Sequence, residues 1–187
     1  MPKKTDTPRL TGLEAIEAPI CRLLILGSMP GRESLSRQRY YAHPRNQFWP
    51  IMTTLLGGEP EAPYPERLSL LKNSRISLWD VIGACIRPGS LDGDIDPRSE
   101  VPNPLPAFMA RHPELEALAF NGRKAESSFK RHFLKKDPTL GHRFKLIALP
   151  STSPAYAGLR AAAKLALWQQ RLAPFLPLQP SRRALRQ

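Results

Sequence analysis

The chain has 187 residues, 41% of them hydrophobic, and its 28 Lys and Arg against 16 Asp and Glu give a formal charge of +12 at pH 7. The length suits one domain with a substantial core, and the positive charge favours a polyanionic partner such as nucleic acid. Two cysteines exclude a disulfide scaffold, and the absence of a long apolar run argues against a membrane protein.

The two ends of the chain differ from its middle. Residues 1–18 begin with basic residues but lack the apolar core of a signal peptide, so we expect a flexible N-terminal arm. Residues 177–187 contain SRRALRQ and are expected to form a basic C-terminal tail. A single domain is therefore predicted over residues 19–176, in a cytoplasmic, monomeric protein whose thiols are reduced.

Four short apolar runs indicate buried strands because most of them show no polar alternation. They are RLLIL (22–26), RISLW (75–79), ALAFN (117–121) and FKLIAL (144–149). Helical patterns cover residues 46–56, 105–118, 123–133 and 158–176. Strands that alternate with crossover helices predict an α/β fold, a three-layer α/β/α sandwich around a four-stranded parallel sheet.

Each predicted strand is followed by a loop of small, polar or proline residues. These loops contain GSMPG, DVIGACIRPGS, NGRKA and PSTSPAYA, and the aromatic stretch YYAHPRNQFW (40–49) lies downstream of the first. Any one of them is typical of a turn. Because ligands bind at the carboxyl ends of parallel strands, the four together predict a binding site on that edge of the sheet.

Several common catalytic motifs are absent from the sequence. The chain has no P-loop, no GxGxxG, no GxSxG nucleophile elbow and no HExxH. Ser28 or Ser34 could be combined with His43 and Asp80 into a triad, but no spacing requires it. The other histidines are dispersed, and we expect no metal site.

The motifs GSMPG, YYAHPRNQFW, LWDVIGACIRPGSLDGDI, FNG and LPSTSPAYA occur in this order between residues 22 and 175. In these motifs the chain resembles the uracil-DNA glycosylase superfamily, and within it the hypoxanthine-DNA glycosylase branch, also called DNA-deoxyinosine glycosylases. The resemblance implies an α/β/α domain whose partner is DNA containing a damaged base. It implies monofunctional, hydrolytic release of a deaminated base, hypoxanthine first, with uracil or xanthine as the alternative. No cofactor is implied, because two cysteines cannot hold the iron–sulfur cluster of some relatives.

The same resemblance implies a pocket for a flipped base. Tyr41 matches an aromatic residue that stacks on the base in related mismatch-specific enzymes, and its alternative role is that of a core tyrosine. Gly27, Ser28 and Met29 would offer backbone N–H groups to the base. Asp80 stands where uracil-specific relatives read the base edge with an asparagine, although it could also cap the following loop.

The expected catalytic group departs from the wider superfamily. Where other branches carry Asp or Asn in the first motif, this chain has Met29, and a thioether cannot polarise water. In the hypoxanthine branch the candidate is the asparagine of HPRN, here Asn46, whose side-chain carbonyl would orient water. A helix N-cap is the competing role for Asn46, because a helical pattern begins there and asparagine is a favoured cap.

The PSTSPAYA loop matches the place where the superfamily inserts a wedge into the DNA stack. The expected DNA contacts come from this loop and the next helix: Ser151, Thr152, Ser153, Ala155, Tyr156, Arg160 and Lys164. The three short hydroxyls suit phosphate contacts, and either Ala155 or Tyr156 could be the wedge. The two basic residues lie four apart on one predicted helix face, which could approach the DNA backbone or simply face solvent.

Two other classes of function remain open from the sequence. The fold could serve a nucleic-acid-binding protein without chemistry, or a hydrolase of a small nucleoside. Release of a base from DNA, but not from free deoxyinosine, would distinguish a DNA glycosylase from both.

Overall fold

The structure of the chain is a computed structural model that describes residues 8–177. Its centre is a four-stranded parallel sheet in the order β3-β2-β6-β7. The strands are β2 (Leu23–Gly27), β3 (Ile76–Asp80), β6 (Ala117–Asn121) and β7 (Lys145–Leu149). The four apolar runs thus form the four predicted strands, each within one residue of its expected start, and β2, β3 and β6 are buried along their whole length.

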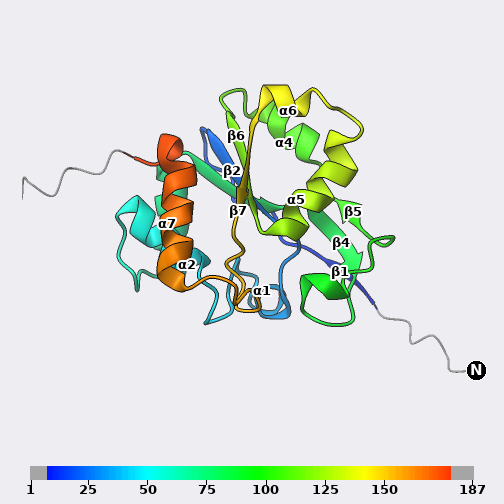
Figure 1. The fold of residues 1–187 in the computed structure, drawn as a ribbon, viewed down its shortest axis with the longest axis horizontal. Coiled ribbons are helices and arrows are strands. Elements are labelled where there is room, and N and C mark those ends of the chain that lie inside the picture. Colours follow the sequence, from blue (N-terminus) through cyan, green and yellow to red (C-terminus); the bar gives the residue numbers. More distant parts are fainter. Residues whose placement is uncertain (1–7, 178–187) are drawn as a thin grey trace, which may run out of the picture.

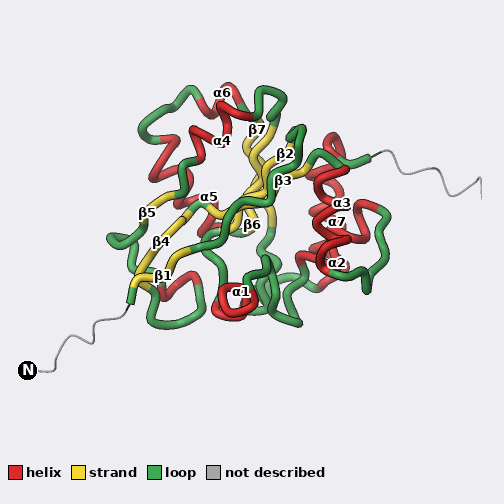
Figure 2. The backbone as a smooth tube through the Cα atoms, turned by 180° about the vertical axis from the view of Figure 1, so that it is seen from behind, coloured by secondary structure: helices red, strands yellow, loops and turns green. Residues whose placement is uncertain are grey.

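Helices cover both faces of this sheet (Figures 1 and 2). One face carries α2 (Phe48–Leu56), α3 (Tyr64–Asn73) and α7 (Ala161–Leu172). The other carries α4 (Leu105–Arg111), α5 (Arg123–Phe129), its continuation as a π-helical turn η2 (Lys130–Leu134), and α6 (Leu140–Arg143). The predicted three-layer α/β/α sandwich is confirmed.

The helix predictions differ from the structure mainly in their boundaries. The helix expected over 105–118 ends at Arg111, because Pro113 disfavours helical backbone at the residue before it and the following residues lead into β6. The helix expected over 158–176 is α7, followed by a short 3-10 turn η3 (Ala173–Phe175). The sequence reading missed α1 (Arg32–Arg37), α3 and α6, since α1 and α6 are short and α3 buries only Leu71.

A second, three-stranded antiparallel sheet lies beside the sandwich in the order β1-β4-β5. It consists of β1 (Arg9–Thr11), β4 (Ile82–Ile86) and β5 (Val101–Pro102), so part of the loop expected after β3 is a strand. The flexible arm expected over residues 1–18 is wrong for its second half, because residues 9–11 pair with β4 and buried Ile16 bridges to Leu78. Residues 1–7 and 178–187 of the two expected tails lie outside the described residues.

The aromatic stretch 40–49 is anchored in the core between α2 and α7. Phe48 is fully buried and packs edge-on against Trp168 with ring centroids 6.0 Å apart, and Trp49 donates its indole N–H to the Tyr40 carbonyl at 2.8 Å. Both cysteines are buried and free. Within residues 8–177, no helix is long and apolar enough to cross a membrane.

Candidate active site

The predicted loops meet at the carboxyl edge of the parallel sheet, where α1 and the loop after β7 lie at the bottom of Figure 1. The aromatic stretch is tied to the fourth loop by a backbone hydrogen bond from Gln47 N to Thr152 O, 3.0 Å long. The Thr152 loop is in turn fixed to the end of β6, because the Asn121 side chain both donates to Thr152 Oγ1 (2.8 Å) and accepts from Thr152 N (2.9 Å). Segments more than 100 residues apart therefore form one edge.

Gly27 and Asp80 end neighbouring strands in register with each other. A Cβ atom on Gly27 would lie 2.2 Å from Asp80 Oδ1 and 3.0 Å from the Tyr41 hydroxyl oxygen. Only glycine leaves room for both polar groups to close over the end of β2. The structure thus brings together three of the predicted base-binding residues.

The Asp80 carboxyl group is only 3% exposed, and its Oδ2 atom has no hydrogen-bond partner in the described part of the chain. Burial, and then the charge of Asp92, raise the pKa of Asp80 to about 8, against the opposing influence of Arg87. At neutral pH the group is therefore mostly protonated, and a protonated carboxyl both donates and accepts a hydrogen bond.

Tyr41 lies beside Asp80 in a strained conformation. Its φ angle of 53° is left-handed, which costs a non-glycine residue about 1–2 kcal/mol. Its ring stacks on Phe48 with centroids 4.0 Å apart and an interplanar angle of 21°, and its hydroxyl is buried without a hydrogen-bond partner among residues 8–177. Burial and the neighbouring Asp80 raise the pKa of Tyr41, while the nearby Asn121 side chain, which falls short of hydrogen-bond geometry, has a small opposite effect. A core tyrosine would instead have a satisfied hydroxyl.

Asn46 stands one residue before Gln47, the N-cap of α2, and its side chain holds the first turn of that helix, which is close to the competing prediction. Its Oδ1 atom accepts a hydrogen bond from Phe48 N at 3.0 Å, and its backbone N–H donates to the His43 carbonyl at 2.9 Å. His43 Nδ1 accepts from Arg45 N at 3.1 Å, so this histidine braces the loop. One lone pair of Asn46 Oδ1 remains available beyond the cap.

Burial corrects the predicted DNA contacts of Thr152 and Lys164, and it is compatible with the backbone role predicted for Met29. The Thr152 hydroxyl is fully buried and held by Asn121, so it does not reach a DNA phosphate. The Met29 side chain, 5% exposed, packs in a core cluster with Ile82, which leaves only its backbone for a ligand. Lys164 is 3% exposed, with Nζ 5.4 Å from the centre of the Tyr156 ring, so it does not share an exposed helix face with Arg160.

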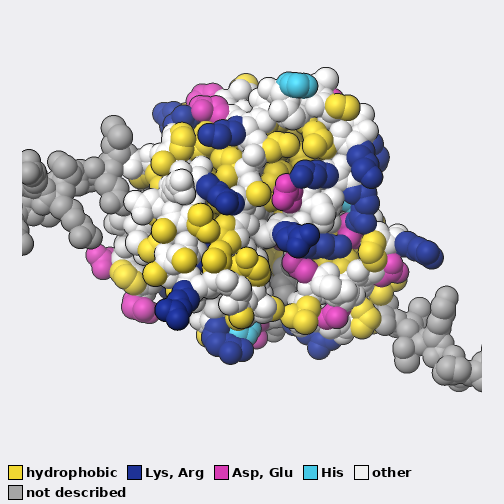
Figure 3. Space-filling view, in the orientation of Figure 1, with side chains coloured by type: hydrophobic (Ala, Val, Ile, Leu, Met, Phe, Trp, Pro, Cys, Tyr) yellow, Lys and Arg dark blue, Asp and Glu magenta, His cyan; other side chains and the backbone are white. Residues whose placement is uncertain are grey.

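The remaining residues of the fourth loop keep their predicted position at the edge. Ser151 Oγ accepts from Ser153 N and Ser153 Oγ accepts from Ala155 N, both at 3.2 Å, so the serines also shape the turn. Ala155 is exposed, and Tyr156 is a large hydrophobic side chain at 40% exposure. Arg160 is exposed immediately before α7. Figure 3 shows further Lys and Arg side chains along the lower edge of this view, below the sandwich.

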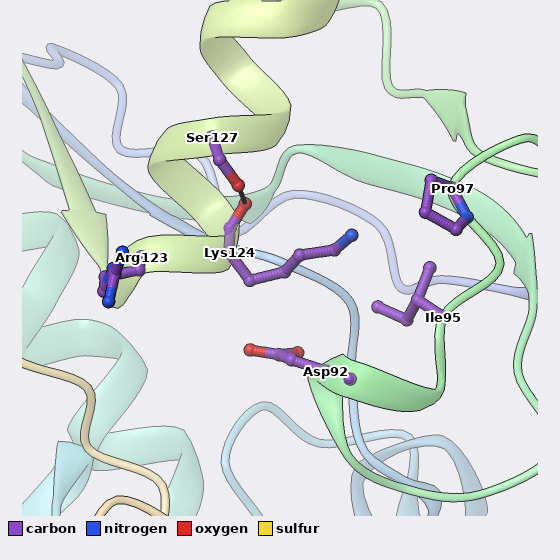
Figure 4. A pocket seen from close by; sticks show the side chains of 7 residues that line it. Asp92, Ile95, Pro97, Arg123, Lys124 and Ser127 are labelled. Carbon is purple, nitrogen blue, oxygen red and sulfur yellow. Dashed lines mark hydrogen bonds between the residues drawn. The ribbon is translucent and has the colours of Figure 1, made fainter.

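The structure adds a residue that the sequence reading missed, Asp92 in the short 3-10 turn η1 (Asp92–Asp94). Its Oδ1 atom accepts a 2.6 Å hydrogen bond from Ser28 Oγ. Asp92 also faces Lys124 across a cavity of about 420 Å³ (Figure 4), whose other lining residues are Gly93, Ile95, Pro97, Arg123 and Ser127. The signal for Asp92 was weak, because nothing in the sequence relates the turn SLDGD to the first motif.

The serine triad considered from the sequence is not formed within residues 8–177. Ser28 pairs with Asp92, and Ser34 Oγ accepts from the backbone of Ala42 at 3.2 Å. His43, as described above, serves its own loop. The described residues contain no group of three or more His, Cys, Asp or Glu that could hold a metal ion.

The chain is similar to known proteins over most of its length. The family model described as the uracil DNA glycosylase superfamily matches residues 16–172. A curated protein named hypoxanthine DNA glycosylase from Methanosarcina acetivorans is 36% identical over 146 residues, which cover 77% of this chain and 86% of that protein. A protein of the same name from Methanosarcina barkeri is 38% identical over 104 residues, covering 55% of this chain and 65% of its own length.

Solved structures give the same result. The solution NMR structure of a candidate uracil DNA glycosylase from Methanosarcina acetivorans superposes with a TM-score of 0.69 at 32% sequence identity, and the match covers 87% of this chain and 98% of that one. The resemblance seen in the motifs is confirmed: the chain belongs to the uracil DNA glycosylase superfamily.

Proposed function

We propose that this protein is a monofunctional DNA glycosylase that flips a deaminated base out of DNA and releases it by hydrolysis, with hypoxanthine in deoxyinosine as its preferred target. The observation that carries the proposal is the buried carboxyl group of Asp80 over the end of β2, whose Oδ2 atom has no hydrogen-bond partner among residues 8–177. Buried polar atoms are normally satisfied, so this one indicates a missing ligand with a polar edge. The names of the two similar Methanosarcina proteins support the same substrate class.

A protonated Asp80 suits a deaminated base. Hypoxanthine presents a carbonyl oxygen next to an N–H group, and a neutral carboxyl can donate to the first while accepting from the second. Uracil and xanthine carry the same pair of groups, so they are the alternative substrates. Tyr41 would hold the ring of the base, because Phe48 supports one face of the tyrosine and base stacking is worth roughly 1–3 kcal/mol.

Release of the base requires little covalent help from the protein. As the bond between the base and C1′ breaks, its electron pair moves to the base, and hydrogen bonds from Asp80 and from backbone N–H groups of Gly27, Ser28 and Met29 stabilise the negative charge. The remaining lone pair of Asn46 Oδ1 would orient the water that adds to C1′. An abasic site remains, and no Schiff base with a lysine is involved.

The DNA around the flipped nucleotide would meet the fourth loop. Ser151 and Ser153 would contact phosphates, and Tyr156, with Ala155 beside it, would fill the space left in the stack. Of the two wedge candidates Tyr156 is favoured by its size and exposure, and the ammonium group of Lys164 against its ring would steady it. Arg160 would approach the backbone.

The test is a panel of labelled oligonucleotides that each carry one hypoxanthine, uracil, xanthine or mismatched thymine. After incubation with the protein, alkali cleaves the strand wherever a base has been released. We expect the fastest cleavage at hypoxanthine. Cleavage at uracil alone would refute the hypoxanthine preference, and no cleavage at any base, with DNA binding retained, would identify a non-catalytic binder. Equal release from free deoxyinosine would indicate a nucleoside hydrolase.

A further inference from the structure

Ser28 and Asp92 form a contact between segments 64 residues apart, at the edge of the base pocket. Ser28 follows directly after Gly27 at the end of β2 and is 8% exposed. Asp92 is itself an exposed residue, but its carboxylate points toward Ser28 and its charge raises the pKa of both Asp80 and Tyr41. The separation of 2.6 Å is that of a strong hydrogen bond to a charged acceptor.

Two arginines fix the turn of Asp92 against the first motif. Arg87, 2% exposed, donates from Nη2 to the carbonyl of Pro30 at 2.6 Å. In the opposite direction, the Arg32 guanidinium donates to the carbonyl of Pro88. Each segment therefore holds the backbone of the other, and the hydrogen bond between Ser28 and Asp92 is a third link between them.

The turn is also shaped internally so that Asp92 faces inward. Asp94 Oδ2 accepts from Leu91 N at 3.1 Å, and Asp94 N donates to the Leu91 carbonyl at 3.0 Å. A Cβ atom on Gly89 would lie 1.8 Å from Asp94 Oδ2, so glycine is required for this closure. Ile95, 3% exposed, anchors the end of the turn in the same core cluster as Met29.

The hydrogen bond fixes what Ser28 can offer to a ligand. A serine hydroxyl has one hydrogen, and that of Ser28 is directed to Asp92. Toward the pocket, the oxygen can therefore only accept. The proposed water-orienting residue, Asn46, has an amide that cannot take up a proton, and Met29 has no proton-accepting group either. Neither of these two residues can therefore serve as the base for the attacking water.

We propose that Ser28 and Asp92 act as a pair that orients the attacking water and takes up its proton, Ser28 by contact and Asp92 as a positioning residue acting through it. The proposal rests on the proposed glycosylase function. As the water oxygen bonds to C1′, one water proton passes to Ser28 Oγ and the Ser28 proton passes to Asp92 Oδ1. The electron pair of the broken bond leaves with the base. The neutral Asp92 afterwards returns its proton to solvent or to the departed base.

The groups around Asp92 act on its charge in both directions. Burial of the carboxylate raises the pKa of Asp92, whereas the Ser28 hydrogen bond, Arg87 and Lys124 oppose this rise and Glu100 adds to it. Asp80, from the end of β3, is the other carboxyl group coupled to it. Because the carboxylate form accepts the proton, base release should decline as the pH falls through the pKa of Asp92.

Asp92→Asn is the sharpest test, because an asparagine oxygen still accepts the Ser28 hydrogen bond but takes up no proton. Single-turnover release of hypoxanthine from an oligonucleotide is measured between pH 4.5 and 9, together with DNA affinity and a urea unfolding curve. We expect a loss of about 10²-fold at pH 7, at the lower end of general acid–base effects. We also expect unchanged DNA affinity and no decline in rate on the acid side of the profile.

Three further variants complete the test. Ser28→Ala should lose a similar factor, and the double variant should be no slower than the slower single one, because the two residues act as a unit. Asp96→Asn removes the same charge from the same loop and is the matched control, with wild-type behaviour expected. A near-normal rate in both Asp92→Asn and Ser28→Ala would overturn the proposal, as would a slow Asp92→Asn variant that keeps the acid-side decline. If the wild-type protein released no base at all, the proposed function itself would fail.

Discussion

Asp80→Asn replaces a buried carboxyl group by an amide of nearly the same shape, and it tests whether Asp80 is protonated in the folded protein. The pKa of Asp80 is raised to about 8 from an ordinary value of 3.8, chiefly by burial. The folded state therefore keeps a proton that the unfolded chain releases above about pH 4. Its contribution to stability is fully present below pH 4 and is lost as the pH rises toward 8.

The magnitude follows from the pKa difference. From 3.8 to pH 7 is about 3 pH units, and each unit corresponds to 1.36 kcal/mol, so the free energy of unfolding of the wild-type protein falls by about 4 kcal/mol over this range on account of Asp80. An asparagine titrates in neither state and escapes this loss. We expect Asp80→Asn to match the wild type near pH 4 and to be more stable by about 4 kcal/mol at pH 7.

The activity of the same variant gives an independent reading. An amide has a donor group on one atom and an acceptor on the other, as a protonated carboxyl does, so release of hypoxanthine at pH 7 should stay within about tenfold of wild type. Above pH 8 the wild-type rate should fall as Asp80 ionises, and the rate of Asp80→Asn should not.

The assays are urea unfolding and single-turnover base release, both from pH 4 to 9. The exposed Asp137, changed to asparagine, controls for the loss of one carboxyl group elsewhere on the surface. Equal pH dependence of stability in Asp80→Asn and wild type would refute the protonated state. A folded but inactive Asp80→Asn variant at pH 7 would show that the carboxyl group acts in a way an amide cannot copy.

Substitutions at three further positions, Tyr41, Asn46 and Gly27, test the rest of the pocket by single-turnover release and urea unfolding. Tyr41→Phe removes only an unpartnered hydroxyl and should keep activity and stability, whereas Tyr41→Ala should lose roughly 1–3 kcal/mol of base stacking; equal loss in both would contradict the stacking role. Asn46→Ala should slow release by about 10²- to 10⁴-fold and lower the free energy of unfolding by about 1 kcal/mol. Asn46→Asp should keep the contact with α2 but change the rate of release. Normal release by the alanine variant would leave Asn46 with a capping role alone. Gly27→Ala should abolish release, because the new Cβ would lie 2.2 Å from Asp80 Oδ1. Gly31→Ala is the control and should behave as wild type, because a Cβ atom on Gly31 would meet no atom within 4 Å. An active Gly27→Ala variant would exclude the close approach of Gly27 and Asp80.

The strands of the sheet were predictable because their signal is local. Each apolar run is long enough for one buried strand, and the order strand, helix, strand leaves few topologies to choose from. The edge strand β1 was missed since its three residues, Arg9–Thr11, carry no apolar pattern of their own and are ordered by pairing with β4. In the same way α3 buries only Leu71, so its sequence shows little of the periodicity that marks a helix.

The candidate site was predictable where strand register decides the geometry. Gly27 and Asp80 end paired strands, so their meeting follows from the topology. The contact between Ser28 and Asp92 depends on a turn held by arginine hydrogen bonds to carbonyl groups, and no spacing in the sequence encodes that. The sequence also did not show which polar side chains are buried. The Thr152 hydroxyl, in a loop, and the Lys164 ammonium group, in α7, are both packed inward and are not available to DNA.

The two aspartates of the site have opposite tasks in this account, and their surroundings account for the division. Asp80 is buried, and its Oδ2 atom has no hydrogen bond among the described residues. Burial also raises the pKa of Asp92, but the Ser28 hydrogen bond, Arg87 and Lys124 oppose that rise. Two neighbouring carboxyl groups do not ionise independently, so the charge on Asp92 helps to keep the proton on Asp80. It follows that Asp92→Asn should also lower the pKa of Asp80 and move the alkaline decline in rate to lower pH. Base recognition and proton uptake from water would then depend on the same negative charge.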